Sequence, residues 1–398
     1  MIKFIFISVA AICLLLDYLA SRRIFAATRS ILLRCAWIGF IAIITIAPII
    51  STLIMGHFVD DNTSSVMHIT SWLFTIYISA LITRIAFYIG WLPLRRHRRL
   101  GLALGSTLSA VVFIQLIVGI AHTRTNIATN HQTLYYTTLP KSFDGYRIAL
   151  FADLHIGSML NPEEESAHLV EIINSTEADA VVFAGDLTHI RHDEITPQIA
   201  AILANIRARD GVISVLGNHD TGVYIKDSVT LSRHENTRLF AEKIDKIGWR
   251  LLRDNTAYIT RDCDSIAITG IDFSDRLLEF KHALNAPEDY DPQRLYRQIP
   301  DNTFSICVSH LPQLWDNAFW RYNLTLAGHV HATQIKFSCG DFALSPAMLL
   351  YNEWSGLYKR NNNDYLYIND GIGCVGFFMR IGAKPEVTVI ELRHKDSD

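Results

Sequence analysis

The sequence predicts an α/β protein in which two packed mixed β-sheets are flanked by helices, preceded by an all-α transmembrane region of four helices. Two observations support this. The chain is apolar and poor in charge up to about position 121, and β-branched runs alternate with helical runs after position 141. Its 398 residues allow more than one domain. We expect a transmembrane anchor over 1–121, a juxtamembrane linker over 122–140 and a globular domain over 141–398.

Four apolar stretches in the first region approach or exceed the roughly 20 residues that cross a bilayer. The first, with Lys3 ahead of its apolar core, also resembles a secretory signal peptide. Three more spans follow, so we expect it to be retained. The four predicted spans are 2–20, 35–56, 69–92 and 101–121.

The charges between the spans predict the orientation. The loop with Asp60 and Asp61 has no Lys or Arg, whereas the other two loops are rich in arginine, and positively charged short loops stay in the cytoplasm. We therefore expect a multi-pass protein of the inner or plasma membrane whose globular domain is extracytoplasmic, on the periplasmic side in a bacterium. Asp17 and Arg84 lie toward the cytoplasmic ends of their spans, where an ion pair would suit an anchor. The loop arginines are Arg22, Arg23, Arg29, Arg34, Arg95, Arg96, Arg98 and Arg99.

Composition restricts the partners. The net charge of -3 and the pI near 6.6 provide no basic field, so nucleic acid is excluded as the main partner. The six cysteines lack CxxC spacing, which indicates neither a zinc knuckle nor a redox pair. The pairing of any disulfide cannot be read from the sequence.

The globular region begins with predicted strands and helices that alternate in βαβ order, and its second half is richer in strands. Residues 122–141 are polar and show no clear apolar period, which predicts a linker. Whether 221–255 forms a lid stays open. We expect strands at 146–151, 180–184, 212–216, 265–271, 304–309, 324–327, 365–369 and 386–392, and helices at 163–174, 197–209 and 236–247.

Polar side chains follow the first two strands. Asp153 and His155 flank one residue, so at an extended strand end they would point the same way and could chelate one cation. The alternative is a helix-capping Asp beside a surface His. Asp186 follows Gly185, and its two oxygens could bridge two cations; the alternative is an Asx turn.

The segment Gly217-Asn218-His219-Asp220 is the strongest local signal. It offers an amide oxygen, an imidazole and a carboxylate on consecutive residues, and Asp220 could orient a nearby imidazole. A simple turn is the alternative.

Three further histidines, His310, His329 and His331, follow later strands. A lone His is usually a core or surface residue, but these three lie downstream of the acidic motifs. In Gly328-His329-Val330-His331 an extended backbone would put both rings on one face. Ligands bind outside the carboxyl ends of strands in open α/β sheets, so all these motifs could converge on one site.

The ordered set Asp-x-His, Gly-Asp, Gly-Asn-His-Asp, His, Gly-His-x-His resembles the calcineurin-like metallophosphoesterases over about 139–392. The later NDGIG and KPEVTVIEL segments look like the membrane-associated bacterial branch of that family. The preceding spans make the chain similar to transmembrane proteins with a metallophosphoesterase domain. The resemblance implies the metallophosphoesterase fold.

The resemblance also implies roles for the site residues. Asp153, His155, Asp186 and His331 would bind one metal, and Asp186 would bridge to a second metal held by Asn218, His310 and His329. His219 would contact the phosphate and protonate the leaving oxygen, with Asp220 setting its orientation. The chain reads Ala332-Thr333-Gln334 where the family commonly has Gly-Gly-Gln, and the added side chains would narrow the space beside the site.

A ligand set of nitrogen and oxygen suits two divalent ions, Mn, Fe, Zn or Mg, roughly 3.5 to 4 Å apart, with a bridging hydroxide that attacks phosphorus in line. We expect a membrane-anchored phosphoesterase, chiefly a phosphodiesterase, whose substrates include lipid-linked phosphate esters in the bilayer. One alternative is a membrane sensor or scaffold that binds a phosphorylated ligand without turnover. Another is a UDP-diacylglucosamine-type pyrophosphate hydrolase, if the domain is cytoplasmic. A transporter is disfavoured because the spans offer few polar residues.

Overall fold

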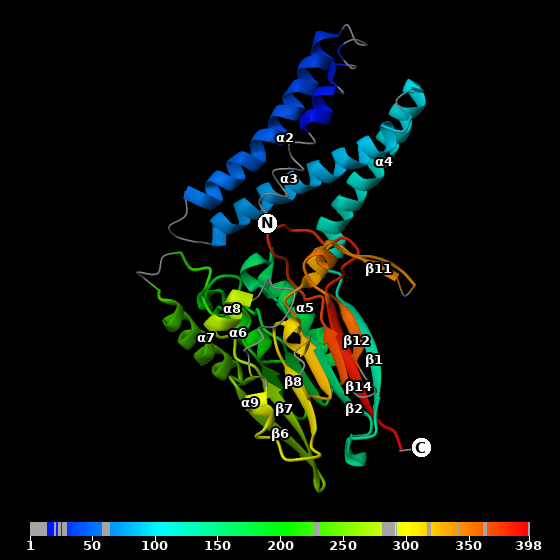
Figure 1. Ribbon diagram of the computed structural model, residues 1–398. Helices are drawn as coiled ribbons and strands as arrows, with labels where there is room; N and C mark the ends of the chain where they lie inside the picture. The colour runs from blue at the N-terminus through cyan, green and yellow to red at the C-terminus, as the bar shows by residue number, and fades with distance from the viewer. Residues whose placement is uncertain are drawn as a thin grey trace. The chain divides into compact units, whose positions relative to one another are not determined.

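In the computed structural model, the chain forms two compact units (Figure 1). The first unit comprises Met1–Ala121 with Gly376–Met379, and the second comprises His122–Val375 with Arg380–Asp398. The change in composition near position 121 therefore coincides with the boundary between the units. The structure describes residues 14–19, 21–22, 25, 30–57, 64–94, 96–226, 231–280, 291, 293–316, 320–340, 342–360 and 364–396.

The first unit is helical, with α2 (Ile31–His57), α3 (Ser64–Trp91) and α4 (Arg98–Val118). Among the described residues, two segments are long and apolar enough to cross a membrane, Met67–Trp91 and Arg99–Thr123. A shorter apolar helix covers Ile31–Ile43. The predicted first span, 2–20, falls largely outside the described residues. The described helices are thus fewer than the four predicted, and two of them have the character of membrane spans.

Asp17 and Arg84 form the anticipated ion pair inside this unit. Tyr88 Oη donates a hydrogen bond of 2.7 Å to Asp17 Oδ1. Both charged side chains are largely buried, at 3% and 10% exposure. A buried charge is costly without a partner, so the pair neutralises two groups that apolar surroundings would otherwise exclude.

The second unit contains two six-stranded mixed sheets and one hairpin. One sheet has the order β1-β14-β2-β3-β4-β5, and the other has the order β12-β13-β9-β8-β7-β6. The hairpin is β10-β11. The first sheet uses β1 (Ala128–Tyr136), β2 (Tyr146–Phe151), β3 (Ala180–Phe183), β4 (Val212–Ser214), β5 (Arg250–Leu251) and β14 (Glu386–His394). The second uses β6 (Asn255–Arg261), β7 (Asp264–Gly270), β8 (Phe304–Val308), β9 (Leu324–Ala327), β12 (Gly356–Arg360) and β13 (Asp364–Ile368), and the hairpin uses β10 (Phe337–Cys339) and β11 (Phe342–Leu344).

The helices of this unit begin and end at recognisable signals. Ser232 caps α7 by accepting the amide of Glu235, and Gly248, with φ 88°, ends the helix in the left-handed region. Pro162 begins α5 and is followed by three glutamates, which favour the positive end of the helix dipole. The helices are α5 (Pro162–Ser175), α6 (Pro197–Leu203), α7 (Arg233–Ile247), α8 (Asp275–Phe280) and α9 (Gln293–Tyr296).

The two sheets bury a shared apolar layer that includes Leu150, Val182, Ile268 and Ile306. Helices cover the opposite face, where Phe151 and Phe183 pack against Trp249. Figure 1 shows α7 at one side of the unit and β1 at the other. Strands β2, β3 and β4 run parallel in one sheet, as do β7, β8 and β9 in the other. Their carboxyl ends are where the polar motifs begin.

The segment 122–140, predicted to be a juxtamembrane linker in which no element could be identified, contains β1, which pairs in parallel with β14. The strand alternates between half-buried and exposed residues until Leu134 and Tyr136, which are buried. Its half-buried positions hold polar residues such as Asn130 and Gln132, so the apolar period that marks most strands is missing. Helix α6 ends at Leu203, before the predicted limit of 209.

Candidate metal centre

Five residues of the motifs adopt left-handed backbone conformations directly after the strands. The φ values are 55° for Asp153, 45° for His155, 62° for Asp186, 74° for His329 and 54° for His331. The extended geometry predicted for Asp-x-His and His-x-His is therefore wrong. Such φ values are uncommon outside glycine, and their concentration in one place is typical of a functional site.

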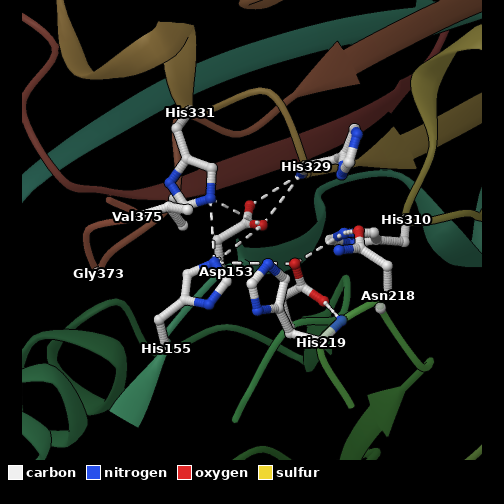
Figure 2. Close-up of polar contacts among 12 residues, drawn as sticks. Asp153, His155, Asn218, His219, His310, His329, His331, Gly373 and Val375 are labelled. Atoms are coloured by element: carbon white, nitrogen blue, oxygen red, sulfur yellow. Dashed lines mark hydrogen bonds and ion pairs between the residues drawn. The ribbon is translucent and has the colours of Figure 1, made fainter. Parts of the chain in front are cut away.

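The first cluster consists of Asp153, His155 and His331 (Figure 2). The Nε2 atoms of His155 and His331 face each other at 3.1 Å. Asp153 Oδ1 lies 3.3 Å from His331 Nε2 and 3.9 Å from His155 Nε2. These three side chains could hold one metal ion.

The second cluster consists of Asp186, His310 and His329. Asp186 Oδ2 lies 3.1 Å from His310 Nε2. Asn218 joins this cluster, since its Oδ1 lies 3.2 Å from the same His310 nitrogen while its Nδ2 donates to Tyr224 Oη at 3.0 Å. The amide therefore presents its oxygen, the atom that ligates metals, to the site.

Asp186 lies between the clusters. Its Oδ2 is 3.7 Å from His155 Nε2 in the first cluster, as well as 3.1 Å from His310 Nε2 in the second. Its Oδ1 accepts the backbone N–H of His219 at 2.8 Å. One carboxylate thus faces both groups, as a bridging ligand requires.

Contacts behind the rings hold them in place. His310 Nδ1 lies 2.8 Å from the carbonyl of Ala184, so a proton on Nδ1 leaves Nε2 free to ligate. Arg380 is fully buried, donates to the carbonyls of Asp370 and Gly373, and approaches His331 Nδ1 at 3.3 Å. Figure 2 shows Gly373 beside the first cluster.

Glycine is required where backbone and carboxylate approach closely. A Cβ on Gly217 would lie 2.0 Å from Asp186 Oδ1, and one on Gly328 would lie 2.6 Å from Asp153 Oδ2. These two contacts explain why glycine precedes Asn218 and His329 in the motifs.

Electrostatics fit a cation site. Burial, with the neighbouring rings of His219 and His331, holds the pKa of His155 well below its usual range, so the ring keeps a lone pair for a metal. Burial lowers the pKa of His310, but Asp186 raises it more, and the result is about 9. Buried carboxylates here attract positive charge, and the nitrogen and oxygen donors suit hard or borderline divalent ions.

Asp220 and His219 lie in the same turn but have different partners. The Asp220 carboxylate accepts the backbone amides of Asp186, Gly217 and Thr188 at 2.8 to 2.9 Å. Burial and the nearby Asp186 raise its pKa to about 7. The ring of His219 instead contacts the carbonyl of His189 through Nδ1, at 2.5 Å. Asp220 therefore organises the turn, and the His189 carbonyl fixes the ring.

Three residues beside the clusters escaped sequence reasoning. His189 forms a third group with His155 and His219, and its Nδ1 lies 3.4 Å from His155 Nδ1. Tyr224 packs on His219 with ring centroids 4.2 Å apart, and Tyr351 Oη lies 3.3 Å from His329 Nε2. His189 has a detectable signal, since it follows Asp186 by three residues in a loop at a strand end. The tyrosines have none.

Comparisons with known proteins agree with this geometry. The profile of the calcineurin-like phosphoesterase family matches residues 146–333. The uncharacterized metallophosphoesterase YkuE of Bacillus subtilis is 27% identical over 67% of this chain and 86% of its own length. A transmembrane protein with metallophosphoesterase domain from Bos taurus is 27% identical over 73% of this chain and 63% of its own. The match thus spans less than two thirds of that relative.

A third relative is the UDP-2,3-diacylglucosamine pyrophosphatase LpxG of Chlamydia trachomatis, 23% identical over 59% of this chain and 81% of its own length. The matched region of the chain includes both clusters, and the family motifs supply their residues. Residues 146–333 therefore form a calcineurin-like metallophosphoesterase domain, and proteins of this family are metal-dependent phosphoester hydrolases.

Proposed function

We propose that this protein is a membrane-anchored dinuclear-metal phosphodiesterase. The observation that carries the proposal is Asp186, whose carboxylate faces two clusters of histidine and aspartate at once. Asp153, His155 and His331 would hold one ion with Asp186, and Asn218, His310 and His329 would hold the other. Two such ions, Mn, Fe, Zn or Mg, supply an activated water and neutralise phosphoryl charge when bound.

His219 is the proposed proton donor to the leaving oxygen. Its Nδ1 faces the carbonyl of His189, which leaves Nε2 as the reacting nitrogen. Burial, followed by the neighbouring His189, holds the pKa of His219 well below its usual range. A phosphate beside the ring favours the protonated form, because an opposite charge stabilises the imidazolium. Asp220 supports this step by holding the backbone on which His219 lies.

We also propose a multi-pass topology with four spans and an extracytoplasmic catalytic domain over 141–398. The arginine-rich loops support this orientation. Two reporters fused after Asp398 test this topology. A reporter that is active only in the periplasm should give a signal, and one that is active only in the cytoplasm should give none. The opposite result would favour a UDP-diacylglucosamine-type pyrophosphate hydrolase, the activity in the name of the chlamydial relative.

The proposed substrate is a phosphate ester, with lipid-linked esters as the class that membrane association favours. The alternative is a sensor that binds such a ligand without turnover. The motif retains His219, which a binding-only protein does not need.

Hydrolysis of bis-p-nitrophenyl phosphate and p-nitrophenyl phosphate by the detergent-solubilised chain tests whether the protein is an enzyme. We expect chelator to abolish cleavage of the diester, Mn to restore it, and His219→Ala to lower it about 100-fold or more. His168→Ala is the matched control, because His168 is an exposed histidine of α5. Two bound metal equivalents without turnover of either probe would support the sensor instead.

A further inference from the structure

The hairpin β10-β11 and the segment after it carry large apolar side chains on the surface. Phe337 and Phe342 are each 61% exposed, and Leu349 is 78% exposed. Leu344 and Met348 are also exposed. Large apolar patches on a protein surface often mark binding sites, because their exposure to water is unfavourable. We call Phe337, Cys339, Phe342, Leu344, Met348 and Leu349 the apolar surface.

Strand register puts the hairpin part of this surface on one face. Phe337 pairs with Leu344, and Cys339 pairs with Phe342, in an antiparallel ladder. Paired residues lie on the same side, and residues two apart along a strand do as well. All four side chains therefore share one face, while Ser338 and Ala343 lie on the other.

Three hydrogen bonds tie this segment to the metal centre. Ser345 directly follows β11, and its hydroxyl bonds the carbonyl of Ala332 at 2.7 Å and Thr333 Oγ1 at 3.1 Å. Six residues later, Tyr351 Oη reaches His329 Nε2 at 3.3 Å. The segment that follows β11 is thus attached at two points, Ser345 and Tyr351, to the loop that carries His329 and His331.

The departure from Gly-Gly-Gln takes part in this attachment. Ala332 and Thr333 have φ values of 47° and 48°, conformations that glycine would adopt more easily. The Thr333 hydroxyl is the group that contacts Ser345. The strained residue supplies a side chain that glycine lacks.

We infer that the apolar surface enters the interface of a lipid bilayer and brings the acyl chains of a lipid-linked phosphate ester to the metal centre. The occupant is lipid because the same chain has two segments long and apolar enough to cross a membrane, and such segments would keep the domain beside a bilayer. Amphipathic helices at a membrane surface place aromatic and aliphatic residues in the acyl boundary, and an apolar hairpin face can bury its side chains there for the same reason. The substrate part of this inference rests on the proposed phosphodiesterase function.

Cys339 provides a probe on the apolar surface, and Cys263, exposed between β6 and β7, provides a matched control. Each is labelled with an environment-sensitive fluorophore in the full chain, with Cys13, Cys35 and the other exposed cysteine replaced by Ser. The chain is reconstituted in phosphatidylcholine–phosphatidylglycerol nanodiscs containing doxyl lipids. We expect at least twofold stronger quenching at Cys339 than at Cys263. Equal quenching would overturn the inference.

A second measurement uses two diester probes. In the double variant Phe337→Ser/Phe342→Ser we expect about tenfold lower kcat/KM for p-nitrophenyl hexadecyl phosphate in nanodiscs, and unchanged kcat/KM for bis-p-nitrophenyl phosphate. Phe337→Leu/Phe342→Leu should restore the first value. Equal loss on both probes would contradict a lipid role. If the unsubstituted chain cleaves neither probe, the proposed function fails, whereas the quenching result still decides whether the surface meets lipid.

Discussion

At the scale of single residues, the two carboxylates of the site should differ in how many metals they hold. Asp153 faces one cluster, whereas Asp186 faces both. We expect Asp153→Asn to bind about one metal equivalent fewer than the unsubstituted chain, and Asp186→Asn to lose nearly both. Elemental analysis after removal of free metal measures this. Equal losses in the two variants would argue against a bridging Asp186.

Glu386 should make stability depend on pH. Burial, followed by the nearby Asp370, raises its pKa from 4.5 to about 7. The folded chain holds this proton more tightly than the unfolded chain, so the cost of ionising Glu386 is complete above pH 7 and disappears as pH falls toward 4.5. Glu386→Gln should therefore stabilise the fold at pH 8, by on the order of 2 kcal/mol, and change little at pH 4.5. Thermal unfolding of the solubilised chain measures both. Glu391→Gln, on the same strand but partly exposed, is the control.

At the scale of elements, α7 supports the turn that carries His219. Asn236 is fully buried, donates to the carbonyl of Asp220 at 3.0 Å and accepts the amide of His192 at 2.8 Å. Asn236→Ala leaves both backbone groups without this partner, so we expect a loss of about 1–3 kcal/mol in unfolding free energy and lower kcat/KM. Denaturant titration and diester hydrolysis measure the two effects.

Ser232→Ala is the control for Asn236→Ala, because it should destabilise α7 without removing a contact to the turn that carries His219. It removes the cap of α7 and should cost about 1 kcal/mol with kcat/KM unchanged. A matching fall in kcat/KM would mean that general loosening of α7, rather than the Asn236 contacts, governs activity.

At the scale of the whole molecule, the metal centre joins the two sheets of the second unit. Asp153, Asp186 and Asn218 follow strands of one sheet, and His310, His329 and His331 follow strands of the other. Metal binding should therefore stabilise the fold, by about 2.7 kcal/mol at a free metal concentration of 100 times Kd. We expect chelator to lower the unfolding temperature and added Mn to restore it. An unfolding temperature that changes with neither chelator nor added Mn would show that metal does not stabilise the loops that connect the two sheets.

Sequence alone determined which residues end the main strands, and hence the candidate ligands. The apolar runs of β2, β3, β8 and β9 are buried on both faces, so their pattern is strong and local. Glycines and polar residues after these runs then indicate the site. Strand β1 was not predicted because its half-buried positions hold polar residues. In the first unit, the four predicted spans outnumber the helices among the described residues.

The family resemblance implied how the ligands divide into two clusters, and only the tertiary structure gives the physical reason. The left-handed conformations of His329 and His331 send neighbouring histidines to different clusters, which an extended strand end would not do. It also decided that the His189 carbonyl, rather than Asp220, holds the ring of His219. Tyr224 and Tyr351 reach the site from loops that no motif marks. These features depend on contacts between segments far apart in the chain, and local sequence patterns carry no information about such contacts.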